Sequence, residues 1–134
     1  MSYISQPIRV RYSDTDQMGY MHHSNYLRFF EIARLEWLTT LGISYKEMEK
    51  SGIWLPVAAA SVHFKNPAYF DDALRVRVQL DAPPMASLLF SYEVHNQDAI
   101  LVCTGNTKLA FLDAQLGRPM RCPENLRQLL RSYL

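Results

Sequence analysis

The chain has 134 residues, of which 49% are hydrophobic and 20% are charged, and its formal net charge is +1. A chain of this length can bury a core without disulfide or metal support, so we expect residues 1–134 to form a single domain. The nearly balanced charge, with no long basic run, argues against a nucleic-acid-binding surface.

The cysteine content and the apolar runs indicate the compartment. Cys103 and Cys122 do not form a CxxC pair, which is typical of a reduced, cytoplasmic protein. The first residues lack the basic and then apolar pattern of a signal peptide. The longest apolar run, residues 53–60, is interrupted by Pro56 and is too short for a membrane span. We therefore expect a cytoplasmic protein without a membrane span.

The N-terminal third predicts one strand and two helices. Apolar and polar side chains alternate over residues 8–12, which indicates a half-buried strand. From about Ser24 the apolar spacing changes to three or four residues, which predicts a long helix that Ser24 or Asn25 caps and that ends near Gly42. Its polar side is marked only by Arg28, Glu31, Arg34 and Glu36. A short helix is expected at residues 44–50.

The rest of the chain predicts four strands and a terminal helix. Alternation indicates strands at residues 58–65, 74–81, 88–94 and 100–112, and Gly105 indicates a bulge or a close backbone approach. Pro123 opens a short amphipathic helix. The order contains no βαβ repeat, which excludes a doubly wound nucleotide-binding fold. It predicts an α+β protein in which a curved, five-stranded antiparallel sheet wraps around one long apolar helix.

Residues 12–26 lie where the first strand meets the long helix. Asp16 follows the strand, and His23 precedes the helix N-terminus. Unpaired backbone N–H groups at a helix start can polarise a carbonyl, and a nearby carboxylate can attack it or activate water. The residues therefore favour acyl transfer with Asp16 as nucleophile or general base. The structural alternative for Asp16 is an Asx-turn or a capping role.

The same stretch could also be read as a metal site formed by Asp14, Asp16, His22 and His23. Adjacent histidines on an extended chain point apart, and the sequence has no HExxH or CxxC companion. We therefore predict no metal ion.

Three segments carry a resemblance to a known family. They are Arg11-Tyr-Ser-Asp-Thr-Asp-Gln-Met-Gly-Tyr-Met-His-His-Ser-Asn-Tyr26, Phe64-Lys-Asn-Pro-Ala-Tyr-Phe-Asp-Asp72 and Gly117-Arg-Pro-x-Arg-x-Pro123. Together they resemble the hotdog-fold acyl-CoA thioesterases, in particular the 4-hydroxybenzoyl-CoA thioesterase and YbgC-like group, over nearly the whole chain. The resemblance implies a hotdog fold and an enzyme that hydrolyses a thioester to a free acid and CoA.

The resemblance also assigns roles by position. Asp16 matches the family's catalytic aspartate, and His23 matches the residue whose backbone N–H polarises the thioester carbonyl, while Asp14 would orient the loop. Substrate contacts are expected from Gly19, Tyr20, Met21, His22, Tyr26, Trp54 and Ser61. Basic side chains that would hold the phosphates of coenzyme A are Lys65, Arg118 and Arg121. Coenzyme A enters only as part of the substrate, and no cofactor is expected.

Hotdog proteins resemble one another in dimerising through an exposed sheet edge, which alone would favour aggregation. We expect a homodimer at least, and a homotetramer as a pair of dimers, with Asp16 facing groups near Lys65 or Ser61 of the other subunit. The substrate could be an acyl-CoA or an acyl carrier protein thioester, with an aliphatic or an aromatic acyl group. Two alternatives stay open: a hotdog dehydratase or hydratase, and a non-catalytic acyl-CoA-binding or partner-binding module.

Overall fold

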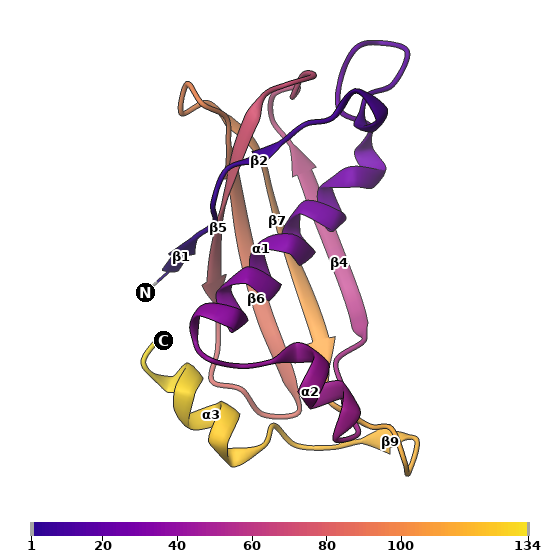
Figure 1. Ribbon diagram of the computed structural model, residues 1–134, viewed down its shortest axis with the longest axis vertical. Helices are drawn as coiled ribbons and strands as arrows, with labels where there is room; N and C mark the ends of the chain where they lie inside the picture. The colour runs from indigo at the N-terminus through magenta and orange to yellow at the C-terminus, as the bar shows by residue number, and fades with distance from the viewer. Residues whose placement is uncertain (1, 134) are drawn as a thin grey trace.

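A long helix, α1 (Tyr26–Thr40), lies across one face of an antiparallel sheet that curves around it (Figure 1). The computed structural model describes residues 2–133. The strand order is β1-β5-β6-β7-β4, and β2 also pairs with β5. The bounds are β1 (Ser2–Ile4), β2 (Ile8–Arg9), β4 (Val57–Phe64), β5 (Ala73–Leu80), β6 (Ser87–His95) and β7 (Leu101–Ala110). The predicted architecture of one sheet around one apolar helix is confirmed.

The first strand differs from the prediction of a continuous segment at residues 8–12. Only Ile8–Arg9 pairs there, and Tyr12 begins a 3-10 turn, η1 (Tyr12–Asp14). An additional strand, β1, pairs with the same side of β5. Pro7 lies between the two pieces and has no N–H to donate, which accounts for the interruption. β1 and β2 therefore share one edge position of the sheet.

The core forms where α1 meets the central strands. Phe30 stacks on Tyr92 of β6 with ring centroids 4.2 Å apart. A Cβ atom at Gly105 of β7 would lie 2.6 Å from the Phe30 ring and 2.7 Å from the carbonyl oxygen of Ser61. Since such distances are too short for a real Cβ, only glycine allows this packing. The predicted close backbone approach at Gly105 is confirmed.

Arg34 departs from the prediction that it marks the polar side of the long helix. It is only 6% exposed, and its Nη1 donates to the Tyr92 hydroxyl at 3.4 Å. That hydroxyl shares a 2.6 Å hydrogen bond with Thr107 Oγ1, and Nη2 of Arg34 lies 3.9 Å from the Glu31 carboxylate. The prediction was wrong because helical periodicity gives the direction of Cβ, whereas a long arginine side chain can turn its charged end to polar groups elsewhere.

Smaller elements gather at the end of the molecule opposite to the start of α1 (Figure 1). They are α2 (Tyr45–Lys50), α3 (Glu124–Arg131) and a small sheet of β3 (Ile53–Trp54), β8 (Leu112–Asp113) and β9 (Arg118–Pro119). The predicted short helices at residues 44–50 and after Pro123 are confirmed. Ser44 is the N-cap of α2, and its Oγ accepts a hydrogen bond from the Glu47 backbone N–H at 3.2 Å.

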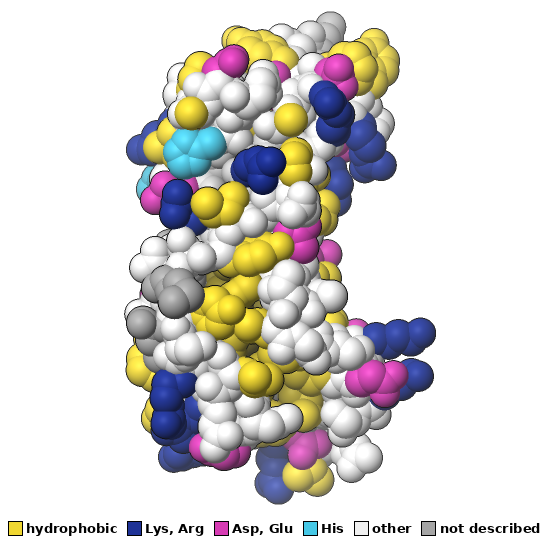
Figure 2. Space-filling model, turned by 60° about the vertical axis from the view of Figure 1, so that its left-hand side comes forward, with side chains coloured by type: hydrophobic (Ala, Val, Ile, Leu, Met, Phe, Trp, Pro, Cys, Tyr) yellow, Lys and Arg dark blue, Asp and Glu magenta, His cyan; other side chains and the backbone are white. Residues whose placement is uncertain are grey.

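Two surface features bear on function. On the face shown in Figure 2, lysine and arginine side chains are interspersed with acidic ones, and hydrophobic side chains gather midway along the molecule. The outer edge of β4 is open, because among the described residues β4 pairs only with β7. Val57 and Phe64, at the two ends of this edge strand, are 49% and 56% exposed. No helix within residues 2–133 is long and apolar enough to cross a membrane.

Candidate active site

Asp14 holds the loop between β2 and α1. Its side chain is 4% exposed, and its carboxylate accepts the backbone N–H of Arg11 at 2.9 Å and pairs with the Arg28 guanidinium at 2.7 Å. The Asp14 carbonyl oxygen accepts the His22 backbone N–H and the Asn25 side-chain amide, each at 2.8 Å. One residue thus joins the strand end, the loop and the first helical turn.

The pKa of Asp14 reflects these contacts. Burial alone raises the pKa of this carboxyl, but the hydrogen bond from the Arg11 backbone and the positive charges of Arg28 and Arg11 lower it by more. The resulting pKa lies below the ordinary value of 3.8, so Asp14 is charged near neutral pH.

Asp16 lies at the base of a tight loop that returns to the helix. Its backbone N–H donates to the Tyr20 carbonyl at 2.8 Å, and Gly19, with φ +86°, donates to the Asp16 carbonyl at 3.0 Å. Oδ1 of Asp16 accepts the Met18 N–H at 2.9 Å, so one carboxylate oxygen forms an Asx-turn. Oδ2 accepts no hydrogen bond from the described residues. Because the Asx-turn uses only Oδ1, the structural role predicted for Asp16 is compatible with the chemical role.

At the start of the helix, one backbone amide has no acceptor among residues 2–133. A 3-10 turn, η2 (His23–Asn25), precedes α1. The Ser24 N–H donates to His22 Nδ1 at 3.2 Å, the Asn25 N–H donates to the His22 carbonyl at 3.0 Å, and the Tyr26 N–H donates to the His23 carbonyl. Of the amides from His23 to Tyr26, only that of His23 has no acceptor within residues 2–133. Asn25 is the N-cap residue of α1, as one of the two predicted alternatives, but its side chain makes no capping hydrogen bond, and the His22 side chain caps the preceding turn η2.

Asp16 and His23 line the same cleft, which has a volume of about 330 Å³. Tyr26 also lines the cleft, and its ring packs edge-to-face against that of Phe64 with centroids 5.0 Å apart. Burial, followed by the nearby Cys103 thiol and Asp16 carboxylate, raises the pKa of Tyr26 to about 12, so its phenol stays neutral. The other residues that line the cleft are Met18, Tyr20, Met21, Lys65, Asn66 and Pro67.

The structure thus brings six predicted site residues to one cleft: Asp16, Tyr20, Met21, His23, Tyr26 and Lys65. Gly19 forms the loop beside it, and the His22 ring lies 4.1 Å from the His23 ring. The expectation that these histidines point apart was wrong, because the chain turns into a 3-10 helix at His23 instead of staying extended.

Four other predicted residues lie away from this cleft. Ser61 donates to Asn106 Oδ1 at 3.0 Å, and both side chains lie on the sheet face turned away from α1. Trp54 belongs to β3, and Arg118 to β9 with Arg121 just beyond it, at the opposite end of the molecule (Figure 1). Within one chain, therefore, these residues are separated from Asp16.

Sequence reasoning left three residues that line the cleft out of the site: Phe64, Asn66 and Pro67. The signal for them was present, because they lie in the segment that begins at Phe64 and carried the resemblance. Strand alternation also places Phe64 on the same sheet face as Val62, toward the helix.

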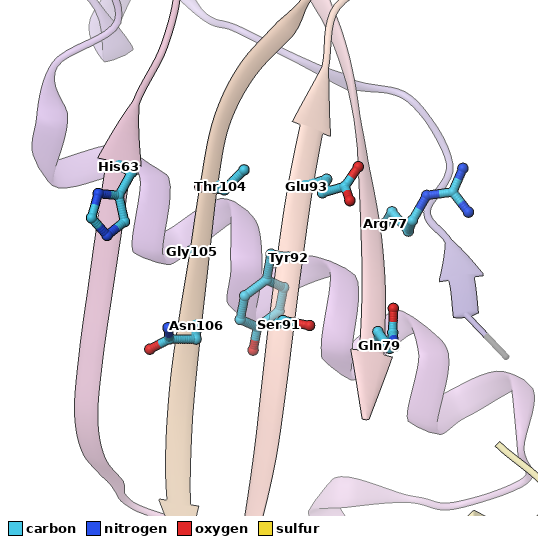
Figure 3. A pocket seen from close by; sticks show the side chains of 9 residues that line it. All are labelled: His63, Arg77, Gln79, Ser91, Tyr92, Glu93, Thr104, Gly105 and Asn106. Carbon is cyan, nitrogen blue, oxygen red and sulfur yellow. The ribbon is translucent and has the colours of Figure 1, made fainter. Parts of the chain in front are cut away.

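A second hollow, of about 200 Å³, lies on the sheet face away from α1 (Figure 3). Its lining side chains include His63 on β4 and Ser91 on β6, but β7 runs between these strands, so the two side chains do not form a nucleophile and base pair. No group of three or more His, Cys, Asp or Glu side chains within the described residues could hold a metal ion. The cleft at Asp16 is the better candidate for chemistry.

Asp16 and the start of the helix thus line one cleft beside a sheet that curves around one helix. Residues 10–130 match the thioesterase-like superfamily. The chain belongs to this family.

Individual relatives agree over nearly the full length. The structure of a DHNA-CoA thioesterase from Staphylococcus aureus is similar with a TM-score of 0.92 at 30% identity, covering 98% of this chain and 89% of that chain. The structure of a hypothetical protein, TT1821 from Thermus thermophilus, is similar with a TM-score of 0.91 at 33% identity, and the match covers 98% of this chain and 98% of that chain. The acyl-CoA thioesterase YbgC of Haemophilus influenzae is 29% identical over 92% of this chain and 90% of its own length. The predicted hotdog fold is confirmed.

We predict that Asp14→Asn lowers the free energy of unfolding by about 2 kcal/mol at neutral pH, because the charged hydrogen bonds of a buried carboxylate are lost. The pKa of Asp14 is depressed in the folded state, so its contribution to stability is present above the unfolded value of 3.8 and is lost as pH falls through the lower folded value. The variant should therefore lose less stability than the wild type on acidification.

The measurement is denaturant unfolding at a series of pH values, with Asp98→Asn as the control, since Asp98 is exposed in a turn. Equal loss of stability on acidification in the wild type and both variants would contradict the role of Asp14.

Proposed function

We propose that this protein hydrolyses acyl-CoA thioesters to a free acid and coenzyme A at the cleft between Asp16 and His23. The observation that carries the proposal is that two groups without a hydrogen-bond partner among the described residues, one carboxylate oxygen of Asp16 and the backbone N–H of His23, belong to residues that line the same cleft. Family membership supports it, as do two relatives whose names specify CoA thioesters.

The chemistry follows from these two groups. The His23 N–H, at the positive end of a helix, donates to the thioester carbonyl oxygen and stabilises the negative charge that develops there. Asp16 either attacks the carbonyl carbon or removes a proton from the water that does so. Attack by activated water breaks the carbon–sulfur bond and gives the acid and the thiol directly. Attack by Asp16 breaks the same bond and gives the thiol and a mixed anhydride of the acyl group with Asp16, which water then hydrolyses to the acid and the free carboxylate. The apolar side chains of Met18 and Met21 suit an aliphatic acyl group, and an aromatic one is the alternative to be assayed.

The position of Arg118 and Arg121 supports an assembly that completes the site. β4 runs from the end of the molecule that carries β9 to the end that carries Asp16, and its outer edge is open. If two copies pair through β4 in antiparallel fashion, the β9 end of one copy comes to the Asp16 end of the other. We therefore propose a homodimer in which Lys65 of one copy and Arg118 and Arg121 of the second hold the coenzyme A phosphates.

A homotetramer built as a pair of these dimers completes the proposed assembly. The proposed reaction needs no metal ion or other cofactor. Both cysteines, Cys103 and Cys122, are free and buried, which is compatible with a reducing compartment such as the cytoplasm.

We predict that Asp16→Asn lowers kcat for acyl-CoA hydrolysis by about 10³-fold or more, because the neutral amide neither attacks nor accepts a proton. The amide oxygen can still accept the Met18 N–H, so the loop should keep its shape. Release of free thiol from a panel of aliphatic and aromatic acyl-CoA substrates is the measurement, with Asp98→Asn as control. Unchanged turnover in Asp16→Asn would remove Asp16 from the mechanism. Hydration of an enoyl-CoA without thiol release by the wild type would favour a hydratase.

The dimer is tested by mixing two defective chains. One carries Asp16→Asn and the other carries Arg118→Gln with Arg121→Gln. If the arginines serve the cleft of the other copy, a purified heterodimer has one unaltered site, and we predict that it regains about half of the wild-type kcat/KM. Activity equal to the mean of the two parents, or a monomeric protein in light scattering, would contradict the assembly.

A further inference from the structure

We propose that the hydroxyl of Tyr26 donates a hydrogen bond to the thioester carbonyl oxygen, as a second donor beside the His23 backbone N–H. This inference rests on the proposed thioester hydrolysis and adds a catalytic residue to it. The tetrahedral intermediate carries its negative charge on that oxygen, and each donor aimed at the oxygen lowers the barrier to reaching the intermediate.

The Tyr26 hydroxyl is a polar group without a partner in the chain. Tyr26 is 3% exposed, and its hydroxyl makes no hydrogen bond with any of residues 2–133. The buried phenol of Tyr92 differs, because its hydroxyl contacts Thr107 at 2.6 Å and Arg34 at 3.4 Å. Buried hydroxyls are normally paired, so the missing partner of Tyr26 points to a bound molecule that supplies one.

The hydroxyl opens into the cleft that Asp16 lines. Among the described residues, the indole nitrogen of Trp37 is the only side-chain nitrogen or oxygen that is both fully enclosed and unpaired. The Tyr26 hydroxyl is unpaired as well, so it is not fully enclosed and reaches accessible space. The hollow that Tyr26 lines is the Asp16 cleft, and its ring packs on Phe64, which lines the same cleft.

Two observations place this hydroxyl beside the groups that act on the carbonyl. Tyr26 follows His23 by three residues, and its N–H donates to the His23 carbonyl, so both residues lie on one side of the helix start. Long side chains in a helix point back toward its N-terminus, which carries the Tyr26 ring over the turn that holds the His23 amide.

The second observation is electrostatic. Burial, then the Cys103 thiol and then the Asp16 carboxylate raise the pKa of the Tyr26 phenol to about 12. The phenol therefore lies within electrostatic range of Asp16, although no hydrogen bond joins the two side chains. It also keeps its proton near neutral pH, so it is available as a hydrogen-bond donor.

The chemistry of the substrate identifies the acceptor. Met21 and Phe64 make the cleft apolar around Tyr26, and a hydrocarbon chain laid over the hydroxyl would remove its water and leave it unpaired, which is unfavourable. The carbonyl oxygen is the acceptor that every acyl-CoA brings to Asp16 and the His23 amide. The bond strengthens as charge develops on this oxygen, and the phenol transfers no proton.

The kinetic test is Tyr26→Phe, which keeps the ring that packs on Phe64 and removes only the hydroxyl. We expect kcat for acyl-CoA hydrolysis to fall by about 100-fold while KM stays nearly unchanged, since the lost bond acts mainly in the transition state. An unchanged kcat, or a rise in KM alone, would show that the hydroxyl serves another part of the substrate and would overturn the proposal.

An infrared measurement tests the contact without turnover. An acyl-CoA with a ¹³C-labelled carbonyl is bound to Asp16→Asn and to the double variant Asp16→Asn with Tyr26→Phe. A hydrogen bond to the carbonyl oxygen lowers the stretching frequency of the carbonyl group, so we expect a higher frequency in the double variant. Equal frequencies in the two variants would contradict the assignment.

Tyr3→Phe is the matched control. Tyr3 lies on β1, at the edge of the sheet opposite to β4, and its hydroxyl donates to Glu36 at 2.5 Å. Its loss should leave kcat and KM unchanged, and thermal unfolding checks that each variant is folded. If Tyr26→Phe does not fold, the distance between the Tyr26 hydroxyl and the ketone oxygen of a bound non-hydrolysable analogue decides: about 3 Å supports the proposal and more than about 3.5 Å overturns it.

Failure of the proposed function gives a different result. A wild-type protein that releases no thiol from any acyl-CoA would contradict hydrolysis itself, and full activity in Asp16→Asn would remove Asp16. Neither result depends on Tyr26. An active wild type, an inactive Asp16→Asn and a fully active Tyr26→Phe would leave hydrolysis standing and overturn only the role of the Tyr26 hydroxyl.

Discussion

The ion pair between Asp14 and Arg28 is the interaction on which the site depends. The carboxylate is almost fully buried, and Arg28 reaches it from the first turns of α1 at 2.7 Å. Because a buried carboxylate without its partner is strongly unfavourable, the loop and the helix start are held together. The Asp14 carbonyl adds a hydrogen bond from the His22 backbone and fixes the turn that follows. Asp16 on one side and the His23 amide on the other then line one cleft.

Much of the fold could be predicted from the sequence, because the elements that form it are long and regular. α1 and the strands β4 to β7 carry clear helical or alternating patterns, and the close packing of Gly105 on Phe30 was signalled by a glycine inside an apolar strand. The strands β3 and β9 have two residues each, too few for any periodic pattern. The buried end of Arg34 depends on a hydrogen bond to Tyr92 of β6, which the periodicity of one helix does not include.

The site was predictable where its residues are close in sequence. Asp16 and His23 lie in one short segment, so their meeting depends on a local turn. Ser61 lies away from the cleft of its own chain, since strand alternation opposes its side chain to that of Phe64, which lines the cleft. Arg118 and Arg121 lie at the far end of the molecule, and one chain gives no means of joining them to Asp16. In the proposed dimer their place depends on how two sheet edges pair, which local patterns do not determine.

The central claim is that Asp16 and the His23 amide act on one carbonyl group. The most direct test is a crystal structure of the Asp16→Asn variant with a coenzyme A analogue in which a methylene group replaces the thioester sulfur. The account predicts that the ketone oxygen lies about 2.7–3.1 Å from the His23 backbone nitrogen, with residue 16 facing the carbonyl carbon. A ketone oxygen bound by other groups, or an acyl chain outside the cleft that Tyr26 and Phe64 line, would contradict it.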